Sequence, residues 1–187
     1  MGIDRRTLIT GTVAALAMPR VALAAPIVLR AEPVNGQILP VGEPATPMLG
    51  FNGSTPGPEL RVRQGETLSV RFDNETAQGS AVHWHGIRLQ NAMDGVPGMT
   101  QPLVEPGASF DYSFQCKDAG TFWYHSHHRS WEQVAKGLYG PLIVDEITPP
   151  DVDHDITVLL DDWRIDVESG DRLGRFGHRH DFSHPGR

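Results

Sequence analysis

The chain has 187 residues, of which 39% are hydrophobic and 21% charged, and its formal net charge is −7 at pH 7. This length allows one full hydrophobic core but not two large domains, and 20 Gly and 15 Pro, spread without a period, argue against collagen, coiled-coil and disordered chains. No basic stripe is left to neutralise phosphates, so the composition also argues against a nucleic-acid partner.

Residues 1–24 have the features of an export signal. Arg5 and Arg6 form a twin-arginine pair, a weakly apolar stretch follows, and the A-x-A sequence at 22–24 is typical of a cleavage site. A membrane-spanning helix needs about 20 apolar residues, roughly twice what this stretch offers, so we expect no membrane anchor. We predict a mature chain that starts at Ala25 and is exported to the periplasm or the cell exterior.

The mature part alternates short apolar runs with turns. Leu60–Val62 and Leu68–Phe72 alternate with polar residues on either side of Gln64 and Gly65, which predicts a hairpin with one solvated face. The only cysteine, Cys116, lies on the apolar side of such a run and is expected to be buried. Helical periodicity is confined to a short turn near 130–135. The further expected strands lie at 27–29, 38–41, 82–89, 109–116, 121–127 and 141–144.

These strands predict an all-β fold, a sandwich or small barrel. The acidic segment 145–155 contains Pro149 and Pro150 and is typical of a linker. Another apolar strand is expected at Ile156–Leu160, but no apolar run follows it. We therefore predict one domain at 25–147, and at 148–187 a linker with the incomplete start of a second domain.

Two histidine pairs carry the candidate chemistry: His83 and His85 in VHWHG, and His125 and His127 in WYHSHH. Residues two apart on a strand face the same way, so each pair shares one face. Four imidazoles without a carboxylate or thiolate suit copper, zinc or nickel rather than calcium or magnesium.

The histidines also allow other interpretations. A single HxH is often a solvated face, and neither GxSxG nor HExxH is present to indicate a serine hydrolase or a zinc protease. His178 and His180 have the same spacing but lie in a polar tail, which favours a solvated loop. His128 has no role that the sequence assigns.

The motifs HWHG followed by MDGVPGMTQ, and GTFWYHSHHRSWEQVAKGLYGPLIV, resemble the first two copper motifs of the multicopper oxidases, the family of laccases, ascorbate oxidases and bacterial copper-resistance oxidases. The resemblance covers about Phe51 to Trp163, and LLDDW resembles the start of the family's second cupredoxin domain. It implies a cupredoxin-like Greek-key β-barrel or sandwich. It also implies that dioxygen is reduced to water at a trinuclear copper cluster while a small reducing substrate is oxidised.

Carried over by motif, the resemblance makes His83 a ligand of the type 2 copper. It makes His85, His125 and His127 ligands of the type 3 copper pair. Asp94, in the MDG sequence, resembles a carboxylate beside the cluster that assists proton delivery, although Asp-Gly is also a common turn.

The family's other cluster histidines and its blue-copper HCH motif come from a C-terminal cupredoxin domain, which these 187 residues do not contain. The first hypothesis is therefore that the chain is the N-terminal part of an exported multicopper oxidase, inactive alone, that needs such a domain. The alternatives are a periplasmic copper-binding module without turnover and an inert β-domain with solvated histidines. The donor substrate is not specified by the sequence.

Overall fold

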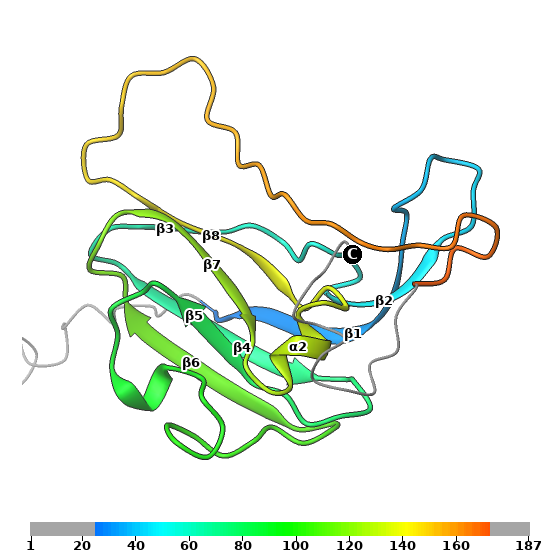
Figure 1. Cartoon of the computed structure of the whole chain (residues 1–187). Coiled ribbons are helices and arrows are strands. Elements are labelled where there is room, and N and C mark those ends of the chain that lie inside the picture. Colours follow the sequence, from blue (N-terminus) through cyan, green and yellow to red (C-terminus); the bar gives the residue numbers. More distant parts are fainter. Residues whose placement is uncertain (1–24, 173–187) are drawn as a thin grey trace, which may run out of the picture.

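The structure is a computed structural model that describes residues 25–172. Two four-stranded sheets face each other and bury the core between them (Figure 1). One sheet has the order β2-β1-β4-β6 and the other the order β3-β8-β7-β5. The strands are β1 (Ile27–Gly36), β2 (Thr46–Phe51), β3 (Leu60–Arg63), β4 (Thr67–Asn74), β5 (Val82–His85), β6 (Ser109–Gln115), β7 (Gly120–Ser126) and β8 (Tyr139–Asp145).

Helix is almost absent from the described residues, where only the 3-10 turn η1 (Asn91–Met93) and the one-turn α2 (Ser130–Gln133) occur. Both sheets are mixed: β1 pairs with β4 and β3 pairs with β8 in parallel, whereas the other pairs are antiparallel. The all-β expectation and the short helical turn near residue 130 are thus confirmed. Among residues 25–172, no helix combines the length and the hydropathy that crossing a bilayer requires.

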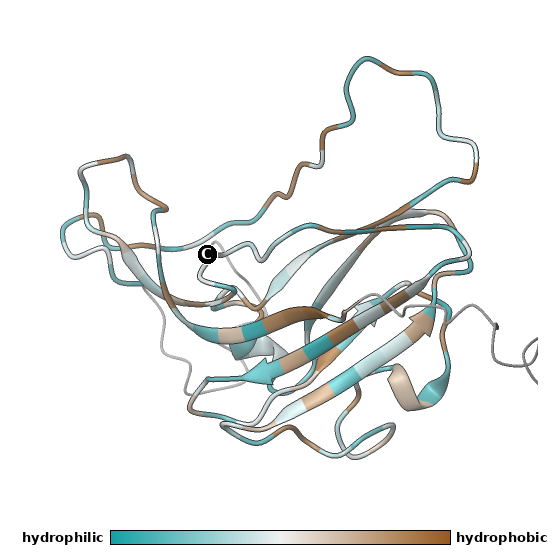
Figure 2. Cartoon of the chain, turned by 180° about the vertical axis from the view of Figure 1, so that it is seen from behind, coloured by the Kyte–Doolittle hydropathy of each residue, from teal (hydrophilic) through white to brown (hydrophobic). Residues whose placement is uncertain are grey.

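Aromatic side chains fill the space between the sheets. Trp84 of β5 is fully buried, and its ring lies 5.3 Å from that of Tyr112 and 5.0 Å from that of Phe114, both on β6 of the opposite sheet. The strands alternate hydrophobic and hydrophilic residues, as Figure 2 shows by colour, because neighbouring residues of a strand face opposite sides. Cys116 is free and buried in this core, as expected.

The predicted hairpin of 60–62 with 68–72 is wrong. β3 pairs in parallel with β8, with Leu60 opposite Leu142, whereas β4 lies between β1 and β6 in the other sheet. Both strands point their apolar residues into the same core, but from opposite sides. The turn at Gly65 (φ +88) therefore carries the chain from one sheet to the other, and alternation alone does not distinguish this crossing from a hairpin.

Two other predicted strands are also absent. Residues 38–41 form a loop, and the edge strand beside β1 is β2 instead, where Pro47 is tolerated because it lies at the sheet edge. Ile156–Leu160 runs without a backbone ladder to any described strand, and its hydrophobic side chains are exposed, with Leu160 at 91%.

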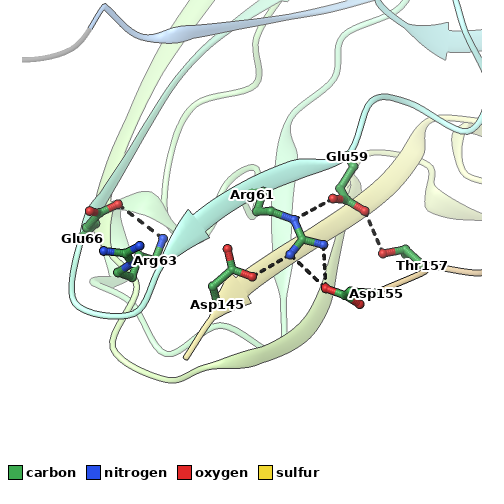
Figure 3. A network of polar contacts seen from close by, with 7 residues as sticks. All are labelled: Glu59, Arg61, Arg63, Glu66, Asp145, Asp155 and Thr157. Atoms are coloured by element: carbon green, nitrogen blue, oxygen red, sulfur yellow. Dashed lines mark hydrogen bonds and ion pairs between the residues drawn. The ribbon is translucent and has the colours of Figure 1, made fainter. Parts of the chain in front are cut away.

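A polar cluster around Arg61 of β3 holds the segment that follows β8 (Figure 3). Its guanidinium contacts Glu59 at 2.9 Å, Asp145 at 2.6 Å and Asp155 at 3.0 Å. The Thr157 hydroxyl donates to the Glu59 carboxylate at 2.7 Å. Residues that lie far apart in the sequence are thereby joined at the surface.

We expect Arg61→Gln to lower the free energy of unfolding by less than about 1 kcal/mol, because exposed ion pairs stabilise little. It should nevertheless speed limited proteolysis within 146–158, since both guanidinium hydrogen bonds to Asp155 are lost. The matched control is Arg88→Gln, which removes only an exposed pair with Asp118. Equal cleavage rates in the two variants would show that Arg61 does not hold the segment.

Candidate metal centre

The two histidine pairs lie on adjacent antiparallel strands of one sheet. β5 and β7 pair with His83 opposite His125 and His85 opposite Trp123. Directly opposite residues of an antiparallel pair share a face, so His83, His85 and His125 project to the same side. Trp84, between the first two histidines, projects into the core instead.

His127 follows β7 directly and completes a group of four imidazoles. One nitrogen of each of His83, His85 and His125 lies within 4.8 Å of the others. The His127 ring centre lies 5.1 Å from that of His83 and 6.1 Å from that of His125. An all-imidazole donor set of this kind fits copper, which binds nitrogen ligands more tightly than other divalent first-row metals do.

Backbone carbonyls fix the tautomers of two of these rings. His83 Nδ1 lies 2.7 Å from the Asp94 carbonyl oxygen, and His125 Nδ1 lies 2.9 Å from the Ser126 carbonyl oxygen. A carbonyl oxygen only accepts, so each Nδ1 carries the proton. Each Nε2 is therefore the nitrogen available to a metal ion, which is how outer hydrogen bonds prepare a histidine ligand.

Burial favours the neutral form of two of the four imidazoles, those of His125 and His127. It lowers the pKa of His125 to about 4, and the neighbouring histidines add to the effect. The pKa of His127 is lowered by burial too, and next by the proximity of His83. Metal ligation requires a neutral imidazole, so this environment favours the form that binds.

Asp94 lies beside His83, in the turn that follows η1. Its carboxylate oxygen Oδ1 is 3.4 Å from His83 Nδ1, in addition to the shorter contact made by its backbone carbonyl. Gly95 comes next, with φ +75, and a Cβ built there would lie 1.7 Å from the Val82 carbonyl oxygen. The turn thus approaches β5 so closely that only glycine fits.

We expect Gly95→Ala to push the 94–95 turn away from β5 and to break the hydrogen bond between His83 and the Asp94 carbonyl. The cost should exceed the 1 kcal/mol or so of a positive φ alone, because a backbone clash is added. Gly98→Ala is the control, since Gly98 has φ +78 with open space around it. Urea unfolding of both variants measures the difference, and equal losses would refute the close-approach argument.

Two residues at the site, Trp123 and Ser126, are not among those predicted from the motifs. Trp123 stacks on His125 with ring centres 4.2 Å apart and lies 5.0 Å from the His85 ring. Trp123 lies two residues before His125 on β7, so strand alternation places it on the same face as the histidines. Ser126 contributes its carbonyl oxygen, which accepts the hydrogen bond from His125 Nδ1.

Among the described residues, His128 does not belong to the group of imidazoles that could hold a metal ion. The predicted leader at 1–24 and the histidines His178 and His180 lie outside the described residues. The predicted domain boundaries stay predictions.

The chain is similar to known proteins. A family model described as "Multicopper oxidase" matches residues 34–148. Copper resistance protein A of Pseudomonas syringae pv. tomato is 43% identical over 117 residues, which cover 62% of this chain and 19% of that protein.

Solved structures agree. Lac15 from a marine microbial metagenome superposes with a TM-score of 0.76 and 71% identity, over 79% of this chain and 39% of that one. A multi-copper oxidase from Pseudomonas thermotolerans gives a TM-score of 0.73 and 45% identity, over 78% and 35%. These two structural matches confirm the cupredoxin-like fold. The chain spans about a fifth of the length of copper resistance protein A. Because the family model covers more than half of the chain and the motif histidines share one sheet face, this chain belongs to the multicopper oxidases.

Proposed function

We propose that this chain supplies half of the histidine ligands of a trinuclear copper cluster in an exported multicopper oxidase. His83 would hold the type 2 copper, and His85, His125 and His127 would hold the type 3 pair. The observation that supports this most is the convergence of the four imidazoles on one sheet face, where His83 and His125 present Nε2. When bound, copper would supply the electron transfer that reduces dioxygen to water while a small reducing substrate is oxidised.

The chain's own residues would orient the ligands and handle protons. The backbone carbonyl of Asp94 holds the His83 ring. The half-buried carboxylate of the same residue also lies beside His83 Nδ1, where it would receive or release a proton. The side chain and the backbone of Asp94 would therefore have separate tasks. Trp123, stacked on His125, would restrict the tilt of that ring.

The remaining ligands and the blue-copper centre would come from a C-terminal cupredoxin domain, and the export route would be the twin-arginine pathway. Complementation tests the oxidase proposal. We expect the copper-loaded chain alone to show no sustained oxygen uptake with phenols, diamines or cuprous ion. Co-expression with a cupredoxin domain that carries the missing motifs should produce uptake, and His125→Ala should abolish it.

His154→Ala serves as the control, because His154 is exposed and lies after β8, outside the histidine cluster. Turnover by the chain alone, lost in His125→Ala, would contradict the need for a second domain. Copper binding without uptake in the co-expressed complex would instead favour the copper-binding module without turnover.

A further inference from the structure

A buried glutamine lies behind the histidine face. Gln133 of α2 is 1% exposed. Its Oε1 accepts hydrogen bonds from the Ser80 hydroxyl at 2.9 Å and from the Ser126 hydroxyl, and its Nε2 donates to the Gly79 carbonyl oxygen at 3.0 Å. The Gly79 carbonyl oxygen can only accept a hydrogen bond, so the amide atom beside it is the nitrogen and the other is the oxygen.

This amide joins the two histidine strands just beyond their last backbone pair. The ladder between β5 and β7 ends at Val82 opposite Ser126. Gly79 and Ser80 lead into β5, and Ser126 is the last residue of β7. The His127 N–H also donates to the Ala81 carbonyl oxygen there, at 3.0 Å. The Gln133 side chain therefore adds to this backbone bond in fixing the distance between the two segments where their ladder stops.

Ser126 transmits this constraint to the histidines on either side of it. Its carbonyl oxygen accepts from His125 Nδ1 at 2.9 Å, and its hydroxyl accepts from the His128 backbone N–H at 3.3 Å. The Ser130 hydroxyl also donates to the Ser126 carbonyl, at 3.0 Å. The orientation of the Ser126 peptide thus sets both the His125 ring and the path of the chain through His127.

We infer that Gln133 is a positioning residue for the copper ligands. It acts through Ser126 to hold His125 in the tautomer that presents Nε2, and to keep the two histidine pairs at a fixed separation. The inference rests on the proposed copper site. It assigns to α2 the orientation of a ligand, whereas the four histidines bind the metal themselves. A buried amide with a purely structural role would contribute stability without selecting a ring tautomer.

The experiment uses the full chain and the variant Gln133→Met, which keeps most of the side-chain volume but makes none of the three hydrogen bonds. In the metal-free chain, nitrogen-15 NMR of the imidazoles reports the tautomer, and we expect the Nδ1-protonated signal of His125 to be lost or mixed. Titration with Cu(II) should show a 10- to 100-fold lower affinity, the range seen when outer partners of metal ligands are removed. The EPR spectrum of the bound Cu(II) should also change.

Leu29→Ala is the matched control, since Leu29 is fully buried on β1 of the opposite sheet and its truncation lowers stability without touching the network. We expect it to leave the His125 tautomer and the Cu(II) spectrum unchanged. If Gln133→Met matches this control in the NMR and EPR spectra and in affinity, the positioning role is wrong.

Ser126→Ala provides a second test, which also decides the matter if Gln133→Met does not fold. It removes the hydroxyl but keeps the carbonyl. We therefore expect smaller changes in the His125 tautomer, the Cu(II) affinity and the EPR spectrum than in Gln133→Met. Where both single variants fold, the double variant should be no worse than Gln133→Met alone, because the two residues act in one chain of contacts. An unaltered His125 tautomer and Cu(II) spectrum in Ser126→Ala would overturn the inference. Failure of the unmodified chain to bind Cu(II) would count against the proposed function instead, and the NMR comparison of the metal-free chains would still decide the role of Gln133.

Discussion

Replacement of His125 by alanine is expected to lower the copper affinity of the chain by more than about 100-fold. Loss of an outer partner of a metal ligand already costs about 10- to 100-fold, and His125 would be a direct ligand. It is also the most buried of the four histidines, at 7% exposure, so water replaces its nitrogen poorly. Single alanine variants at His83, His85 and His127 should lose affinity as well.

Titration against a chelator of known copper affinity measures these losses, and His154→Ala controls for non-specific histidine binding. Copper should be preferred to zinc at matched concentration, because nitrogen sites follow the divalent order in which copper exceeds zinc. Binding should also weaken in acid, where protons compete for the imidazoles. Unchanged affinity in all four variants would show that the two pairs do not form the site.

The second large effect concerns the core behind the histidines. We expect Trp84→Ala to lower the free energy of unfolding by about 3–5 kcal/mol, the range for truncating a buried Trp. Trp84 is fully buried and its ring contacts aromatic rings of β6 and β7. Its neighbours in sequence are His83 and His85, so a collapsed cavity would also move both ligands and weaken copper binding.

Trp84→Phe should cost much less than Trp84→Ala. The indole Nε1 is buried without a hydrogen-bond partner, so its removal relieves an unsatisfied donor while an aromatic ring is kept. Val41→Ala, at a side chain 96% exposed, should change the unfolding free energy by no more than about 0.5 kcal/mol. Chemical unfolding of the three variants checks this order, and similar losses for Phe and Ala would contradict the packing argument.

The histidine face was predictable because it depends on a local rule. Alternation on a strand puts His83 with His85, and His125 with the residue two positions on, whatever the rest of the fold does. The sequence motifs also indicated the family. Neither source showed that the Asp94 carbonyl, rather than its carboxylate, makes the shorter contact with His83, because that depends on the backbone of a turn.

The strand pairing was less predictable. β3 and β4 have the alternation and the turn of a hairpin, and only the competing partners β8 and β1 decide against it. Those partners lie far away in the sequence and have no local signal. Gln133 was missed for the same reason, since a polar residue in a short turn is usually exposed and its burial depends on Gly79, Ser80 and Ser126.

The parallel pair of β3 with β8 has a consequence for the order of assembly during synthesis. It joins distant segments, as does the contact of Arg61 with Asp145 across 84 positions. A ribosome must therefore release residues beyond β8 before the sheet that carries the histidines can close. Folds dominated by such non-local pairings also form slowly. For a time the nascent chain would hold its imidazoles on incompletely packed strands, and we expect metal ions to compete for them most freely in that interval.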